Sequence, residues 1–99
     1  MARADSPTVT EYLAECLWPG VTGARLTEAD LRARRSAASH EDGVGYVGTI
    51  LMPDDEVVFF VFNGPSARAV RAVAARAEIP FERIVPSLRT SNPTERKEP

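Results

Sequence analysis

The stretch Val44–Phe62, VGYVGTILMPDDEVVFFVF, decides the fold of this chain. Two apolar runs, 44–52 and 57–62, flank the polar connection Pro53-Asp54-Asp55-Glu56, which is typical of two antiparallel strands joined as a hairpin. Both runs are apolar on both faces, whereas a two-layer domain standing alone needs only one apolar sheet face. We therefore expect the second face of this sheet to be covered by something.

The register of the hairpin determines which side chains share a face. An even number of connecting residues gives two sets: Tyr46, Ile50 and Met52 with Val57, Phe59 and Val61, and Val47 and Leu51 with Val58, Phe60 and Phe62. An odd number would pair the sets the other way round.

A strand and a helix precede the hairpin. Residues 8–18 alternate, so that Tyr12, Ala14, Cys16 and Trp18 share one face and Val9, Leu13, Glu15 and Leu17 share the other. Thr27 is predicted to open a helix that runs to about Ser39, with Asp30 at the capping-box position and Leu31 and the alanines facing inward. Gly43 follows, where a left-handed residue is often needed.

A second helix and a fourth strand follow the hairpin. Ser66 is the predicted N-cap, and Pro80 ends the helix. The buried stripe at helical spacing comprises Ala69, Val70, Val73, Ala74 and Ala77. The fourth strand is predicted over 82–85.

The order strand, helix, strand, strand, helix, strand predicts an α+β fold, the βαββαβ sandwich known as ferredoxin-like. Right-handed crossovers place both helices on one face of a four-stranded antiparallel sheet. Because the open face carries large apolar side chains, we expect a homodimer packed through it as a dimeric α/β barrel. The alternative is a monomer that uses this face as a ligand cleft.

Length and charge restrict the class of protein. The chain has 99 residues, a formal charge of −2 and a single cysteine. One domain over 8–86 is expected, between a flexible leader (1–7) and a disordered polar tail (87–99). The absence of a basic patch argues against nucleic-acid binding, and no signal or membrane-spanning pattern is present. These features, with the lone cysteine, predict a cytoplasmic protein that does not bind membranes.

Four short segments resemble motifs of a known family: Glu15–Thr22 (ECLWPGVT), Gly43–Tyr46 (GVGY), Phe62–Arg71 (FNGPSARAVR) and Ile79–Val85 (IPFERIV). Together they are similar to a family of small bacterial proteins with a ferredoxin-like fold, catalogued as a domain of unknown function. One branch is described as nickel-binding and dimeric. The resemblance spans about residues 8–85. It implies the fold, the dimer and a divalent metal such as nickel as a ligand.

Glu15 is the foremost candidate site residue, because it is a charge in the middle of an apolar strand. A buried carboxylate needs a partner or a raised pKa. It is a candidate metal or small-molecule ligand, or a general base in a cavity. The alternatives are an ion pair with an arginine, or a solvent-exposed edge position. Glu11 shares its face but lies nearer the strand end.

Four further residues are weaker candidates. His40 is the second candidate metal ligand, although a histidine at a helix C-terminus also interacts favourably with the helix dipole. Tyr46 and Trp18 are candidates for lining a ligand pocket, or else for the core or an interface. Cys16 is expected to be a small buried hydrophobe rather than a nucleophile.

These observations favour a small homodimeric binding protein for a metal ion or small molecule. The first alternative is a cofactor-free isomerase- or cyclase-like enzyme of the dimeric α/β barrel type, with a cavity near Glu15; it rests on analogy of fold. The second is a protein that serves only as an interaction module. The sequence does not decide whether the protein is an enzyme, but it favours a binding protein.

Overall fold

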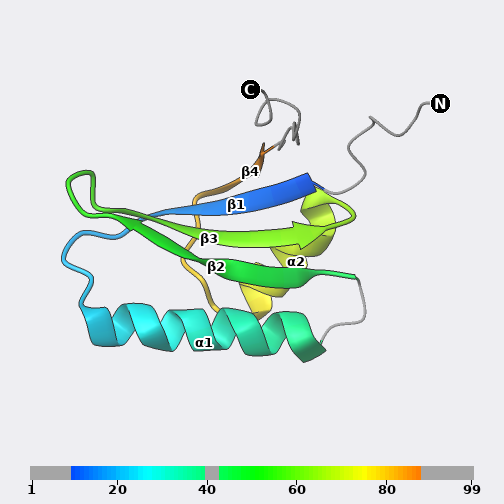
Figure 1. Ribbon diagram of the computed structural model, residues 1–99, viewed down its shortest axis with the longest axis horizontal. Coiled ribbons are helices and arrows are strands. Elements are labelled where there is room, and N and C mark those ends of the chain that lie inside the picture. The colour runs from blue at the N-terminus through cyan, green and yellow to red at the C-terminus, as the bar shows by residue number, and fades with distance from the viewer. Residues whose placement is uncertain (1–9, 40–42, 88–99) are drawn as a thin grey trace, which may run out of the picture.

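The computed structural model describes residues 10–39 and 43–87. Its elements are β1 (Thr10–Leu17), α1 (Gly23–Ser39), β2 (Gly45–Met52), β3 (Val57–Gly64), α2 (Ala67–Arg76) and β4 (Arg83–Ser87). The sheet has the order β2-β3-β1-β4, and every neighbouring pair is antiparallel. Both helices lie on one side of it (Figure 1). The predicted ferredoxin-like fold is confirmed.

The core lies between the sheet and the two helices. On the sheet, the alternate residues Tyr12, Ala14 and Cys16 of β1 and Val58, Phe60 and Phe62 of β3 are buried. Helix α1 contributes the small residues Ala29, Ala33 and Ala37, and α2 contributes Val70, Val73 and Ala74. Small side chains at helical spacing allow each helix to approach the sheet closely. The predicted inner faces of β1 and α2 are therefore confirmed.

Helix α1 begins earlier than the sequence pattern predicted. The Oγ1 atom of Thr22 accepts a hydrogen bond from the Arg25 amide at 3.1 Å, so Thr22 is the N-cap and Thr27 lies inside the helix. The prediction that Leu31 faces inward was also wrong, because 43% of its surface is exposed. The four-residue spacing of Ala29, Ala33 and Ala37 fits a helix that begins at either threonine, so this spacing does not indicate where α1 begins.

The hairpin has the predicted even connection, but a β-bulge changes the faces at one end. Met52 pairs with Val57 and Ile50 with Phe59, as predicted. Between Tyr46 and Gly48 the register shifts by one residue, so Tyr46 pairs with Phe62 on the helix side. The prediction that Tyr46 shares a face with Ile50 was wrong, because the bulge inserts Val47 as an extra residue.

The later elements follow the sequence patterns, except that α2 ends at Arg76, with Ala77 as its C-cap, before the predicted end at Pro80. The Ser66 hydroxyl oxygen accepts a hydrogen bond from the Ala69 amide at 3.1 Å, which confirms it as the N-cap of α2. Gly43 has a φ of +79°, the left-handed conformation expected after α1. Strand β4 begins at Arg83 and continues to Ser87, the residue at which the predicted tail begins. No helix in the described part of the chain is long and apolar enough to cross a membrane.

Candidate functional site

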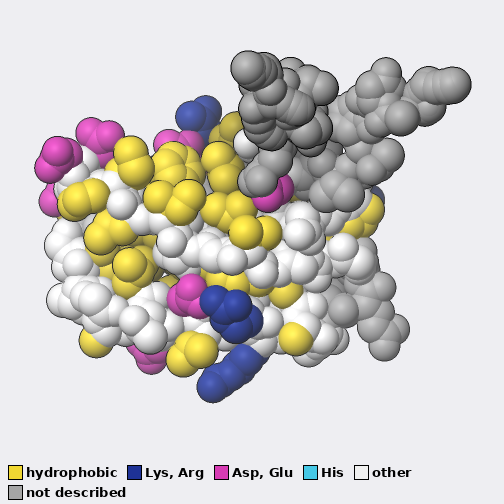
Figure 2. All heavy atoms as spheres, viewed as in Figure 1, with side chains coloured by type: hydrophobic (Ala, Val, Ile, Leu, Met, Phe, Trp, Pro, Cys, Tyr) yellow, Lys and Arg dark blue, Asp and Glu magenta, His cyan; other side chains and the backbone are white. Residues whose placement is uncertain are grey.

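The face of the sheet that the helices leave uncovered is apolar. We call it the outer face, and its apolar side chains are Leu13 and Leu17 of β1, Ile50 and Met52 of β2, Val57, Phe59 and Val61 of β3, and Val85 of β4. Leu17 is 54% exposed and Ile50 48% exposed. Figure 2 shows hydrophobic side chains gathered over the strands on this side of the molecule. Such a patch on a small domain usually marks an interaction surface.

Glu15 lies on the outer face, where it is paired with an arginine. The Arg83 Nε atom donates a hydrogen bond to Glu15 Oε1 at 2.5 Å, and the two residues are register partners between β1 and β4. This hydrogen bond and the carboxylate charge raise the pKa of the Arg83 guanidinium. Only 25% of the Glu15 side chain is exposed. The geometry is that of an ion pair at the margin of the apolar patch, and Glu11 lies on the same face.

On the other side of the sheet, Tyr46 belongs to a chain of polar side chains between β2 and α1. The Thr49 hydroxyl donates to Asp30 Oδ2 at 3.0 Å, and Arg34 Nη2 donates to Asp30 Oδ1 at 2.9 Å. Because the single Thr49 proton is directed to Asp30, the Tyr46 hydroxyl donates to the Thr49 oxygen. The Arg34 guanidinium also lies over the Tyr46 ring, 5.2 Å from its centre.

The environment of Tyr46 favours its neutral form. Burial raises the pKa of the phenol to about 12. Its ring also packs edge-on against Phe62, with the two ring centres 5.0 Å apart. Tyr46 therefore remains a hydrogen-bond donor at neutral pH.

A groove opens beside these side chains, and we call it the α1–β2 groove. It has a volume of about 400 Å³ and is lined by Leu26, Thr27, Asp30, Leu31, Arg34 and Thr49. The sequence pattern predicted Asp30 only as a capping residue and indicated no role for Arg34 or Thr49. The four-residue spacing of Asp30 and Arg34 on one helix was a signal for their ion pair.

Trp18 lines a different and smaller groove. It lies with Gly20, Val21, Leu51, Pro53 and Glu56 around a volume of about 210 Å³. Its ring packs partly against the core, and the Arg25 guanidinium lies over the ring, 5.9 Å from the ring centre. Trp18 and Tyr46 are thus on the helix side of the sheet, whereas Glu15 is on the outer face. The structure does not bring these three predicted ligand-binding residues together.

Cys16 is buried in the core, where its thiol is protonated. It has no exposed surface, and its Sγ atom lies 3.9 Å from the Ala14 carbonyl oxygen. Burial, together with the negative charges of Glu82 and Glu15, raises the pKa of the thiol from 9.0 to about 12. Cys16 is therefore a buried residue of the core, as the sequence predicted.

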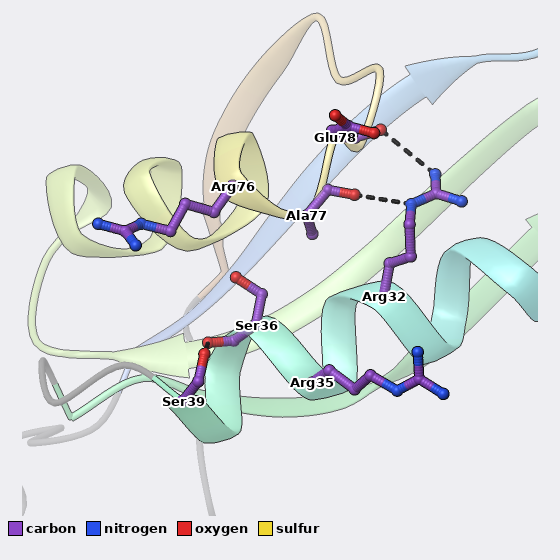
Figure 3. Close-up of a pocket in the computed structure, with 7 residues that line it drawn as sticks. All are labelled: Arg32, Arg35, Ser36, Ser39, Arg76, Ala77 and Glu78. Atoms are coloured by element: carbon purple, nitrogen blue, oxygen red, sulfur yellow. Dashed lines mark hydrogen bonds between the residues drawn. The ribbon is translucent and has the colours of Figure 1, made fainter.

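A cleft between the two helices is rich in arginine. It encloses about 390 Å³ and is lined by Arg32, Arg35, Ser36, Ser39, Arg76, Ala77 and Glu78. Arg32 donates to the carbonyl oxygens of Ala77 and Glu78 at 2.8 and 3.3 Å, and so stabilises the end of α2. Arg35 and Arg76 point in opposite directions (Figure 3). The contacts of Arg32 therefore hold the two helices together, but the arginine side chains of the cleft do not converge on one binding point.

The described residues of a single chain do not fit a nickel centre. No group of three or more His, Cys, Asp or Glu side chains within residues 10–39 and 43–87 is placed to hold a metal ion. Glu15 is paired with Arg83, Cys16 is buried in the core, and His40 lies outside the described residues. None of the three grooves described above is lined by Glu15, which does not favour a catalytic cavity at this residue.

A family profile described as "Nickel responsive protein SCO4226-like" matches residues 12–86. The chain belongs to this SCO4226-like family. The match spans β1 to Pro86 of β4, and thus includes both the outer face and the α1–β2 groove. The family resemblance inferred from the four sequence motifs is confirmed.

A solved structure shows the same fold. The crystal structure of SCO4226 from Streptomyces coelicolor A3(2) superposes with a TM-score of 0.59 and 22% identity, over 77% of this chain and 90% of that one. At this identity the likeness supports the fold of the SCO4226-like family, and it transfers no individual site. The search of the curated proteins found no match.

Proposed function

We propose that this protein is a small cytoplasmic homodimer, joined through the outer face, that binds a divalent metal such as nickel. The observation that carries the dimer is the outer face itself: its four strands contribute apolar side chains to a surface that neither α1 nor α2 covers, and Leu17, Ile50 and Met52 are exposed on it. Packing two such sheets against each other removes this surface from water, and the hydrophobic effect favours that burial.

The size of the chain supports the same conclusion. The elements of this small domain lie within residues 10–87, and a domain of this size buries a smaller fraction of its surface than a large one, so its own core is modest. Both helices of this protein present mainly alanine and valine to the sheet, whereas phenylalanine, isoleucine, leucine and methionine side chains remain on the outer face. A second copy would therefore add a second apolar core between the two sheets.

The metal is proposed from the family name, which describes nickel-responsive proteins. The donors of one chain within residues 10–39 and 43–87 do not form a site, and in this proposal donors from both chains of the dimer complete it. Glu15 lies on the face that the second copy would cover, so that donors from both chains can surround its carboxylate. A metal bound there competes with Arg83 for the same oxygen atoms. His40 remains the second proposed ligand because nickel prefers imidazole to carboxylate.

The dimer is tested by measuring the mass in solution with light scattering after gel filtration. The native chain, whose mass is 10.8 kDa, is expected at about twice that value. Phe59→Lys places a charge at the centre of the outer face and should give a monomer. Leu31→Lys is the matched control, since Leu31 is an exposed apolar residue on α1. A native chain that remains monomeric at high concentration contradicts the proposal.

The metal is tested separately by thermal unfolding with nickel, cobalt and zinc, and by elemental analysis of the purified protein. A ligand that binds only the folded state raises the melting temperature. Nickel should do so for the native chain but not for Glu15→Gln, while Glu28→Gln on the exposed side of α1 should respond like the native chain. Absence of any shift, together with a metal-free preparation, would show that metal binding is wrong even if the dimer is right.

A further inference from the structure

The α1–β2 groove combines apolar walls with a charged end. Leu26 and Leu31 belong to its wall, and Leu31 leaves 43% of its surface exposed although it is a large apolar residue. Asp30, Arg34 and Thr49 form the polar end. A volume of about 400 Å³ lies within the usual range for small-molecule sites, which is roughly 300–1,000 Å³.

The polar end depends on the bulge in β2. In a regular strand, Tyr46 and Thr49 would lie on opposite faces, because they are three residues apart. The extra residue Val47 brings both side chains to the helix side, where they form one hydrogen-bonded chain with Asp30. Bulges that re-aim a side chain are frequent beside functional sites. The bulge therefore builds the hydrogen-bonded polar end of the groove.

The charges at this end favour an anion. Of the paired side chains, Arg34 is 55% exposed and Asp30 only 23%, so the cation is the more accessible partner. Asp30 already accepts hydrogen bonds from Thr49 and Arg34, whereas Arg34 uses one nitrogen for Asp30 and retains further N–H donors.

We propose that the α1–β2 groove binds a small monocarboxylate with an aliphatic or aromatic tail, held by the Arg34 guanidinium at one end and by Leu26 and Leu31 along the tail. A guanidinium matches the planar geometry of a carboxylate. The hydrogen-bonded chain from Tyr46 through Thr49 to Asp30 fixes the position of Arg34, whose guanidinium also rests on the Tyr46 ring. The groove lies on the opposite side of the sheet from the outer face, so this site is independent of the proposed dimer.

The test is a titration of the ¹⁵N-labelled full-length chain with hexanoate, followed by the backbone amide resonances of Asp30, Leu31 and Thr49. Saturable shifts at these positions are expected. Hexanamide has the same tail without the charge and should bind about tenfold more weakly, because it cannot form charge-assisted hydrogen bonds with the Arg34 guanidinium. Equal affinity for the two probes, or no saturable shift with hexanoate, would overturn the proposal.

Three variants locate the site. Arg34→Gln should weaken hexanoate binding about tenfold. Leu31→Glu should abolish it by placing a carboxylate in the groove; because Leu31 is exposed, this variant should stay folded even if Arg34→Gln does not. Arg35→Gln is the matched control on the same helix and should bind as the native chain does. An equal loss in Arg35→Gln would show only a general attraction to α1, and would overturn the assignment to the groove.

Discussion

The buried thiol of Cys16 should be almost unreactive in the folded protein. Its pKa is raised from 9.0 to about 12, which lowers the thiolate fraction at pH 8 roughly a thousandfold. The side chain also has no exposed surface, so a reagent cannot reach the sulfur without opening of the fold. The low ionisation of the thiol and its lack of exposure therefore both slow the reaction. The low ionisation alone should lower the labelling rate roughly a thousandfold.

The assay is alkylation with iodoacetamide at pH 8, followed by mass spectrometry. The native chain should react at least about a thousandfold more slowly than the same chain unfolded in guanidinium. Its rate should rise with the fraction of unfolded protein as denaturant is added. Labelling of the native chain within about tenfold of the unfolded rate would show that Cys16 is accessible or ionised, and would refute the core assignment.

The same thiol has a defined effect on stability at high pH. Because its folded-state pKa lies above its unfolded value, the unfolded chain loses the proton first. The stability contributed by the neutral buried thiol is fully present below pH 9 and is lost as the pH rises towards 12. Urea unfolding from about pH 7 to pH 11 should therefore show a steeper loss for the native chain than for Cys16→Ala. Parallel curves would contradict this account.

Two pairs of substitutions test the helix start and the core. In urea unfolding, Thr22→Ala should lower the free energy of unfolding by about 1 kcal/mol, because it removes the N-cap of α1. Thr27→Ala, inside α1, should change it by less than about 0.5 kcal/mol. A larger loss from Thr27→Ala than from Thr22→Ala would support the helix start predicted from the sequence. Phe60→Ala should cost about 3–5 kcal/mol because Phe60 is fully buried, while Leu31→Ala should stay within about 0.5 kcal/mol, and similar losses from both would contradict the packing described for α1.

The local patterns that repeat along the chain predicted the fold well. Alternation in β1 placed Tyr12, Ala14 and Cys16 together, and the helical spacing of Val70 and Val73 identified the buried side of α2. These predictions succeed because strand and helix periods determine which side chains share a face, whatever the rest of the fold does. The same alternation indicated an apolar outer face, and the register of the sheet confirms it.

The start of α1 was predicted wrongly because Asp30 occupies the capping-box position relative to Thr27, and this local pattern favoured Thr27 as the N-cap. In the structure Asp30 is used instead for Thr49 and Arg34, which lie across the helix–strand contact and along the helix. The residues near Thr27 do not indicate that Asp30 accepts a hydrogen bond from Thr49, which lies in a strand 19 positions later.

The candidate site divides in the same way. The sequence by itself determined that the sheet has two apolar faces and that two helices cover one of them. It also identified Glu15 as a charged residue in the middle of an otherwise apolar strand. Only the tertiary structure decided that Glu15 pairs with Arg83 and that a bulge turns Tyr46 towards Thr49 and α1. The physical reason is that periodicity is a property of neighbours in the chain, whereas partners across strands and helices depend on register, which one inserted residue can change.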